Sequence, residues 1–248
     1  MESFGTRLST VVRERGQLCV GIDPHPEMLT SWGMGIDVAG LERCARTMVE
    51  AAADQVAVVK PQSAFFEAFG AAGVRVLERV LADCRDAGAL TLLDVKRGDI
   101  GSTMAAYAQA YLADGSPLAA DAITVSPYLG FDSLTPAIAL AAQTGRGVFV
   151  LARTSNPAGA EVQLAQHDGR PVGQRVVDRV AALNADAIDA DAIGSYGIVY
   201  GLTHAELDLD LSALHGPILV PGLGSQGGQP SDVRRLFGAS AHAALPSS

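Results

Sequence analysis

Eight short runs rich in aliphatic and β-branched residues recur along the chain, with helical stretches between them. They cover residues 17–23, 54–60, 89–96, 120–126, 147–153, 196–202, 217–221 and 240–245. Several runs are almost continuously apolar, which is typical of parallel strands covered on both faces. Amphipathic stretches such as 38–53 and 73–87 separate them, and Gly88 is a helix stop signal. This alternation predicts a parallel α/β fold, and eight strands favour a closed (β/α)8 TIM barrel over an open sheet.

The length of the chain fits one such barrel. Its 248 residues contain no repeat and no low-complexity linker, so we expect a single domain over 1–248. The sequence stops at LPSS, soon after the last run, and we expect that the final C-terminal segment of the barrel is missing from it. Residues 155–170 are too polar and glycine-containing for a core element, which predicts a long loop over the site.

Composition excludes several classes of protein. A net charge of -9 without a basic patch argues against a nucleic-acid partner. The apolar runs are too short to span a membrane and the first 16 residues are too polar for a signal peptide, so we expect a cytoplasmic protein. Cys19, Cys44 and Cys84 have neither CxxC nor metal-ligand spacing, which predicts reduced core thiols and no zinc site.

Lysine is almost absent from the chain. Of its 18 basic residues only Lys60 and Lys96 are lysines. Surroundings can tune the pKa of a lysine, whereas arginine does not give up its proton. Both lysines end predicted strands, where barrels assemble their active sites. We therefore predict that they take part in chemistry, the alternative being a bias toward arginine that left two lysines by chance.

Further charges gather at the same predicted strand ends. Asp23 ends the first strand, and DVKRGDIGST places Asp94, Lys96 and Asp99 within six residues. The period of two along a strand turns Asp94 and Lys96 to one side. Such charges are tolerated in a partly buried mouth only when opposite signs pair. With Lys60 on the neighbouring strand this predicts an active site, and the alternative is an ion-pair network that fastens loops.

A glycine-rich segment, PGLGSQGGQP at 221–230, lies between a strand and the helical pattern SDVRRLFG. Such a loop can surround a phosphate with backbone N–H groups and with the side chain of Gln226. The alternative is a turn required only by the geometry of the connection.

Six motifs occur in an order known from one family: GIDPHP (21–26), VKPQSAFFE (59–67), DVKRGDIGST (94–103), SPYLG (126–130), RTSNP (153–157) and VPGLGSQGG (220–228). With them, essentially the whole chain resembles the orotidine 5'-phosphate decarboxylase family in its type 2 bacterial form. The resemblance implies a homodimeric, cytoplasmic lyase of de novo pyrimidine biosynthesis. It would convert orotidine 5'-phosphate to UMP without metal or cofactor, and without a nucleic-acid or membrane partner.

The same resemblance implies the roles of the charged residues. Lys60, Asp94, Lys96 and Asp99 would form the family's alternating catalytic array. Lys96 would donate the proton that replaces CO2 at C6. Asp99 would reach into the active site of the partner subunit.

The resemblance further implies six substrate-binding residues, which are Asp23, Ile100, Thr103, Ser155, Pro221 and Gln226. Asp23, together with Lys60, would hold the ribose hydroxyls, and Ser155 would contact the pyrimidine edge. Ile100 and Thr103 would come from the partner subunit. Pro221 and Gln226 would lie in the loop that closes on the phosphate. The family continues with a phosphate-binding arginine and a final helix, both beyond Ser248.

Three other functions fit the same barrel less well. A magnesium-dependent enzyme that forms an enediolate also carries DxKxxD, but it has a carboxylate ligand where this chain has Lys60, and an ammonium repels Mg²⁺. A Schiff-base aldolase needs a neutral lysine, while the flanking aspartates favour the charged form. A non-catalytic phosphate-binding protein would keep the glycine-rich loop but would not need the charge array.

Overall fold

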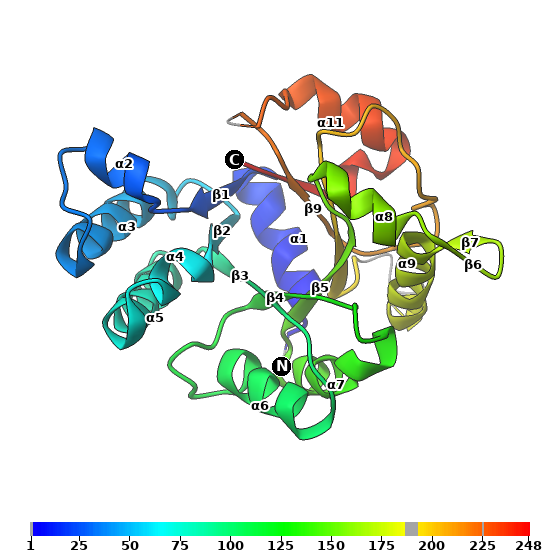
Figure 1. Ribbon diagram of the computed structural model, residues 1–248, viewed down its shortest axis with the longest axis horizontal. Helices are drawn as coiled ribbons and strands as arrows, with labels where there is room; N and C mark the ends of the chain where they lie inside the picture. Colours follow the sequence, from blue (N-terminus) through cyan, green and yellow to red (C-terminus); the bar gives the residue numbers. More distant parts are fainter. Residues whose placement is uncertain (1, 187–192, 225) are drawn as a thin grey trace.

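The predicted barrel is present in the structure, a computed structural model that describes residues 2–186, 193–224 and 226–248. Its strands are β1 (Cys19–Ile22), β2 (Val58–Pro61), β3 (Leu90–Arg97), β4 (Ala122–Val125), β5 (Gly147–Arg153), β8 (Tyr196–Tyr200), β9 (Ile218–Pro221) and β10 (Ala244–Ser247). They are parallel and close in the order β1-β10-β9-β8-β5-β4-β3-β2 (Figure 1). The prediction of a (β/α)8 barrel is confirmed.

Helices surround the barrel (Figure 1). They are α1 (Phe4–Arg15), α2 (Pro26–Ser31), α3 (Val38–Ala52), α4 (Ser63–Glu67), α5 (Gly70–Asp86), α6 (Gly101–Leu112), α7 (Thr135–Thr144), α8 (Ala160–Gln163), α9 (Val172–Leu183) and α11 (Pro230–Phe237). The predicted stretches 38–53 and 73–87 correspond to α3 and α5. Helix α3 begins where the Asp37 side chain accepts a hydrogen bond of 2.8 Å from the Gly40 N–H. Gly88, just after α5, has the positive φ of 72° that suits glycine at a helix end.

Helix α1 closes the amino end of the barrel. Its Phe4 and Leu8 pack into a buried cluster with side chains of the strands, including Leu92 and Phe149. The rings of Phe4 and Phe149 meet edge to face with centroids 6.0 Å apart. A second, larger cluster fills the space between strands and outer helices. Because apolar side chains fill the amino end, the carboxyl ends of the strands are left for polar residues.

Two predicted segments differ from the structure. The last strand was expected at 240–245, but β10 begins four residues later, after a 3-10 helix at Gly238–Ala243. The Gln17 amide donates to the carbonyl oxygens of Ala241, His242 and Ala244 at 2.8 to 2.9 Å and holds this turn.

The expected long loop at 155–170 is only partly irregular. It contains a 3-10 turn at Pro157–Gly159, the short helix α8 and a hairpin of β6 (Gln166–His167) and β7 (Arg170–Pro171). Hydrogen bonds within the segment form these turns and the hairpin. The polar composition of the segment did not predict them.

The three cysteines are buried and free, as predicted. Burial raises the pKa of Cys19 to about 11 and that of Cys84 to about 12, which makes both thiols poor nucleophiles. Over the described ranges, no helix combines the length and the apolar character needed to cross a membrane.

Candidate active site

A cavity of about 710 Å³ opens at the carboxyl ends of the strands. This is the end at which barrels of this kind assemble their active sites. Seven of the ten predicted site residues line it, namely Asp23, Lys60, Asp94, Lys96, Ser155, Pro221 and Gln226. They come from widely separated parts of the chain, and the strand ends bring them together.

Two lysines flank one buried carboxylate in this cavity. Lys96 Nζ lies 2.6 Å from Asp94 Oδ2, and Lys60 Nζ lies 3.8 Å from the same oxygen. Lys60 Nζ is also 3.8 Å from Asp23 Oδ1. Lys60 and Asp94 are buried, whereas the Lys96 side chain is 45% exposed. The ammonium of Lys96 is thus held by Asp94 and is accessible from the cavity.

The two carboxylates respond differently to this environment. Burial by itself would raise the pKa of Asp94, but the charges of Lys60 and Lys96 and hydrogen bonds from Lys96 and Thr124 outweigh it and lower that pKa. Burial raises the pKa of Asp23, because the attraction of Lys60 compensates only in part and Asp94 repels it. Asp94 is therefore the more strongly ionised group.

The backbone of β3 is irregular where it carries Lys96. Lys96 has a φ of 45°, and the register between β3 and β4 shifts between Leu93 and Arg97. The Lys96 N–H donates to Thr124 Oγ1 at 2.9 Å. Asp94 and Lys96 do meet as predicted, but simple strand alternation is not the whole cause. A role for Thr124 was not predicted from the sequence. The only indication of one is that it places a hydroxyl within an apolar run.

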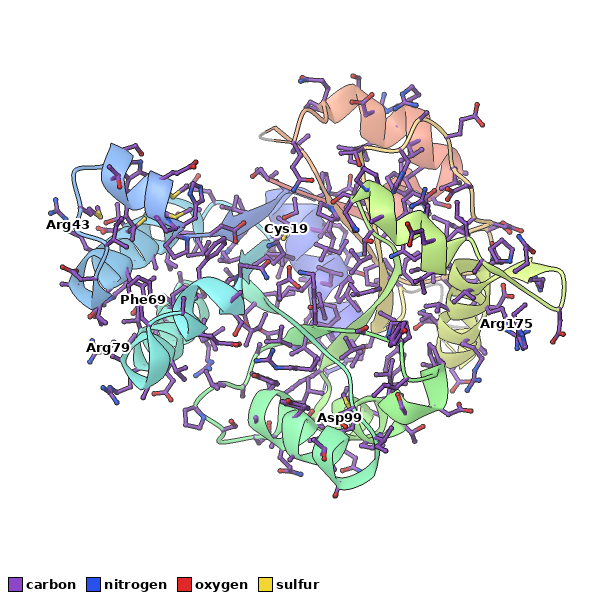
Figure 2. All side chains as sticks on the ribbon, in the orientation of Figure 1. Cys19, Arg43, Phe69, Arg79, Asp99 and Arg175 are labelled. Carbon is purple, nitrogen blue, oxygen red and sulfur yellow. The ribbon has the colours of Figure 1, made fainter. Side chains whose placement is uncertain are left out.

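Three predicted residues do not line this cavity. Asp99 precedes α6, where its carboxylate accepts from the Ile100 N–H at 2.8 Å (Figure 2). The Ile100 side chain and Thr103 are exposed on the start of α6. A single chain therefore does not bring Asp99 to the Lys60–Asp94–Lys96 cluster. That Asp99, Ile100 and Thr103 reach the cavity of a partner subunit stays a prediction.

The turn that carries Ser155 is fixed from two sides. Thr154 N–H donates to Gln163 Oε1 at 3.0 Å, and Thr203 Oγ1 donates to the Ser155 carbonyl at 3.0 Å. A Cβ on Gly201 would lie 2.5 Å from Ser155 Cα, so only glycine fits there. No motif in the sequence indicated that residues 201–203 support this turn.

Arg153, which ends β5, does not line the cavity. Its Nε donates to Asp208 Oδ2 at 2.8 Å, and Tyr200 OH donates to Asp208 Oδ1 at 2.6 Å. Arg153 therefore forms an ion pair with a loop carboxylate.

The glycine-rich loop folds back on itself before α11. Gly224 N–H donates to the Gly228 carbonyl, and Gly228 N–H donates to the Gly222 carbonyl, each at 2.9 Å. Gly222, Gly224 and Gly227 all have positive φ, which explains the choice of glycine. Residue 225 lies outside the described residues. Because Pro221 and Gln226 line the cavity, this turn lies at its edge.

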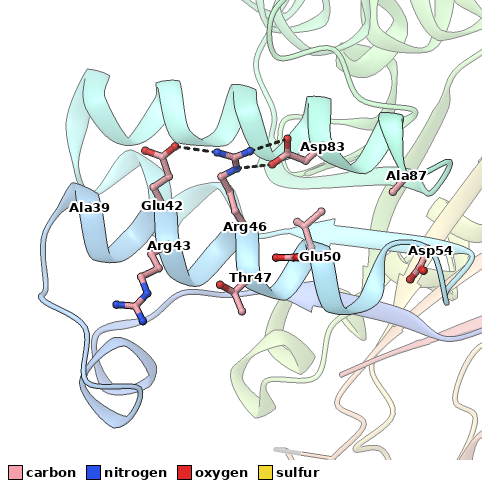
Figure 3. A pocket seen from close by; sticks show the side chains of 10 residues that line it. Ala39, Glu42, Arg43, Arg46, Thr47, Glu50, Asp54, Asp83 and Ala87 are labelled. Carbon is pink, nitrogen blue, oxygen red and sulfur yellow. Dashed lines mark hydrogen bonds and ion pairs between the residues drawn. The ribbon is translucent and has the colours of Figure 1, made fainter.

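A second hollow of about 860 Å³ lies on the outer face of α3 and α5 (Figure 3). Arg46 pairs there with Asp83 at 2.7 Å and with Glu42 at 3.6 Å. These charges satisfy one another on an exposed surface, where such pairs contribute little. We therefore place the functional site in the barrel cavity.

No group of three or more His, Cys, Asp or Glu side chains within the described part of the chain is arranged to hold a metal. The closed parallel barrel, with a cavity at its carboxyl end lined by two lysines and two aspartates, places the chain in the TIM-barrel class. The model of the orotidine 5'-phosphate decarboxylase / HUMPS family matches residues 16–244. The chain belongs to this family, as the motifs predicted.

Curated relatives and a solved structure agree with this membership. The chain is 60% identical over 247 residues to an orotidine 5'-phosphate decarboxylase of Salinispora tropica and 55% identical to one of Streptomyces coelicolor, in each case covering 99% of this chain and 88% of the relative. A crystal structure of a putative orotidine 5'-phosphate decarboxylase from Streptomyces avermitilis matches with a TM-score of 0.94 and 53% identity. That match covers 100% of this chain and 86% of the other.

Proposed function

We propose that this chain converts orotidine 5'-phosphate to UMP and CO2 in de novo pyrimidine biosynthesis, without metal or cofactor. The observation that carries the proposal is the Asp94 carboxylate held between the chain's two lysines, 2.6 Å from Lys96 and 3.8 Å from Lys60, on the wall of the cavity. The names of its relatives supply the substrate. The predicted cytoplasmic location belongs to the same proposal.

The chemistry requires a cation at the reacting carbon. When the bond from C6 to the carboxylate breaks, its electron pair stays in the plane of the ring, where no adjacent carbonyl spreads it. A fixed ammonium can stabilise that charge and then give its proton to C6. Lys96 has the required access to the cavity, and Asp94 Oδ2, 2.6 Å from its Nζ, holds it in place. Solvent then returns a proton to the neutral amine.

The remaining residues of the cavity fit the rest of the nucleotide. Asp23 Oδ1 is buried and has no hydrogen-bond partner within the described residues, so a ribose hydroxyl would satisfy it. Ser155, on its rigid turn, suits the pyrimidine edge. Pro221 and Gln226 belong to the loop whose backbone amides suit the phosphate.

We infer that the working unit is a homodimer. Ile100, which follows β3, and Tyr128 and Leu129, which follow β4, are large apolar side chains that are 62%, 77% and 52% exposed. Tyr128 also lines the cavity. A second copy covering this rim would bury these side chains and bring Asp99, with Ile100 and Thr103, toward the partner's cavity.

The test of the proposed function is the loss of absorbance of orotidine 5'-phosphate with EDTA present. Turnover is expected to be the same with and without the chelator, because Lys60 stands 3.8 Å from both Asp23 and Asp94 and repels a cation. Activity that disappears with EDTA and returns with Mg²⁺ would support the enediolate enzyme instead. Binding of UMP without turnover would indicate a non-catalytic protein.

A substrate without its phosphate is expected to react more slowly as well as bind more weakly. Orotidine has no phosphate and so cannot form at least two charge-assisted hydrogen bonds that the phosphate would accept. Binding energy from such a remote group can assist the step at C6. We expect kcat/KM to fall about 100- to 1,000-fold, with a decrease in kcat. Steady-state kinetics with both compounds measure this.

Gln226→Ala provides the control for the phosphate effect, because Gln226 lines the cavity from the glycine-rich loop. It should slow the reaction of the phosphorylated substrate and leave that of orotidine almost unchanged. Equal kcat values for orotidine and its phosphate in the unaltered protein would show that the loop does not assist catalysis.

A further inference from the structure

We propose that Thr124 is a positioning residue, whose hydroxyl holds the carboxylate of Asp94 and the backbone of Lys96 in their catalytic arrangement. The inference rests on the proposed function and extends it to a residue that does not line the cavity.

Three hydrogen bonds join Thr124, Asp94 and Lys96 into a ring. Thr124 Oγ1 donates to Asp94 Oδ1 at 2.6 Å and accepts from the Lys96 N–H at 2.9 Å. Lys96 Nζ closes the ring by donating to Asp94 Oδ2 at 2.6 Å. Each oxygen of the carboxylate therefore has its own donor. The ring links the backbone N–H of Lys96 to the ammonium of the same residue, through the fully buried hydroxyl of Thr124 and the carboxylate of Asp94.

The direction of the hydroxyl proton follows from its partners. A backbone N–H can only donate, so the Lys96 N–H occupies a lone pair of Thr124 Oγ1. The single proton of the hydroxyl is then directed at Asp94 Oδ1. This orientation favours the ionised carboxylate, and it exists before any substrate binds.

Thr124 also replaces a missing bond of the sheet. Between the pairs Leu93–Ile123 and Arg97–Val125 the register shifts, and Lys96 has a φ of 45°. An N–H in such a bulge lacks the regular carbonyl acceptor of the ladder. The side chain of Thr124 supplies an acceptor in its place. The unusual backbone of Lys96, which directs its ammonium, is thereby stabilised from β4.

Removing the hydroxyl should change the electrostatics of Asp94 without removing a charge. Lys60 from β2, Lys96 from β3 and Asp23 after β1 are the charged groups that act on Asp94. All three remain in Thr124→Val. Because one hydrogen bond to the carboxylate is lost, the pKa of Asp94 rises and the carboxylate is protonated at a higher pH than in the unaltered protein.

The chain offers a matched control in Thr91. Like Thr124 it is buried, but it lies in β3. Its hydroxyl donates to Asp121 Oδ2 at 2.9 Å and accepts from the Asp121 N–H at 3.0 Å. Asp121 is bonded in turn to Arg7 of α1, at the amino end of the barrel. Thr91→Val therefore removes the same kind of bond at the end opposite to the cavity.

The experiment compares Thr124→Val, Thr124→Ser and Thr91→Val by thermal unfolding and by the pH dependence of kcat and KM. In Thr124→Val we expect kcat to fall about 10- to 100-fold while KM changes little, with the acid limb of the kcat profile moved to higher pH. Thr124→Ser should restore both. Thr91→Val should lower Tm and leave kcat and the pH profile unchanged.

Two results would overturn the role of Thr124: an unaltered kcat and pH profile in Thr124→Val, or equal losses in Thr124→Val and Thr91→Val. Should the valine variant not fold, Thr124→Ala is compared with Thr124→Ser by the same criteria. Carboxyl ¹³C NMR titration of Asp94, assigned with Asp94→Asn, measures the pKa change without turnover. An inactive unaltered protein would then reject the proposed function, while the NMR result still decides the role of Thr124.

Discussion

Lys96→Ala is expected to remove decarboxylation almost completely while the barrel stays folded. The substitution takes away both the cation that stabilises the C6 carbanion and the proton that follows, which together are worth about 10⁴-fold or more in kcat. Folding should survive because the Lys96 side chain is 45% exposed and Asp94 keeps Lys60 at 3.8 Å. Measurement of orotidine 5'-phosphate loss, with circular dichroism and thermal unfolding alongside, tests this.

Lys96→Arg separates the two parts of this role. Arginine keeps a positive charge but is a very poor acid, so it can stabilise the carbanion without readily protonating it. We expect this variant to be nearly as inactive as Lys96→Ala. Near-normal turnover in either variant would mean that another group supplies the proton, and Lys96 would lose its assigned role.

Mixing two inactive variants is expected to restore activity if the site is shared between subunits. Asp99→Ala should lower kcat by about 10³-fold, because one fixed charge next to the reaction is lost. Lys96→Ala and Asp99→Ala damage different halves of a shared site. In a mixed dimer one site takes intact Lys96 and intact Asp99 from different chains, while the other site carries both lesions.

The recovery has a defined size. Equal amounts that exchange at random place about half of the subunits in mixed dimers, so about a quarter of all sites are intact. The measurement is specific activity after joint refolding, and each variant refolded alone is the control. If Asp99 acted within its own chain, every site would keep one lesion and no recovery would occur.

Much of the fold could be predicted because the strands are apolar and regularly spaced. All eight predicted runs overlap strands of the barrel, and α3 and α5 lie where the helical spacing placed them. The last run was placed too early because residues 238–243 are mainly alanine and glycine, which do not favour strands, and they form a 3-10 helix. A contact from Gln17, far away in the sequence, fixes that turn.

The site could be predicted where it depends on strand ends and not where it depends on how adjacent strands pair. Lys60, Asp94 and Lys96 stand out by residue type and position, and the structure brings them together. The left-handed backbone of Lys96 and its bond to Thr124 arise from an irregular pairing of β3 with β4. Sequence periodicity contains no information about such a shift in register.

Phe4 and Leu8 of α1 also bear on how ligands reach the cavity, because their side chains pack into the amino end of the barrel. We therefore expect substrate to enter, and carbon dioxide and UMP to leave, by the cavity at the opposite end. Both products would then depart along the route by which the substrate arrives.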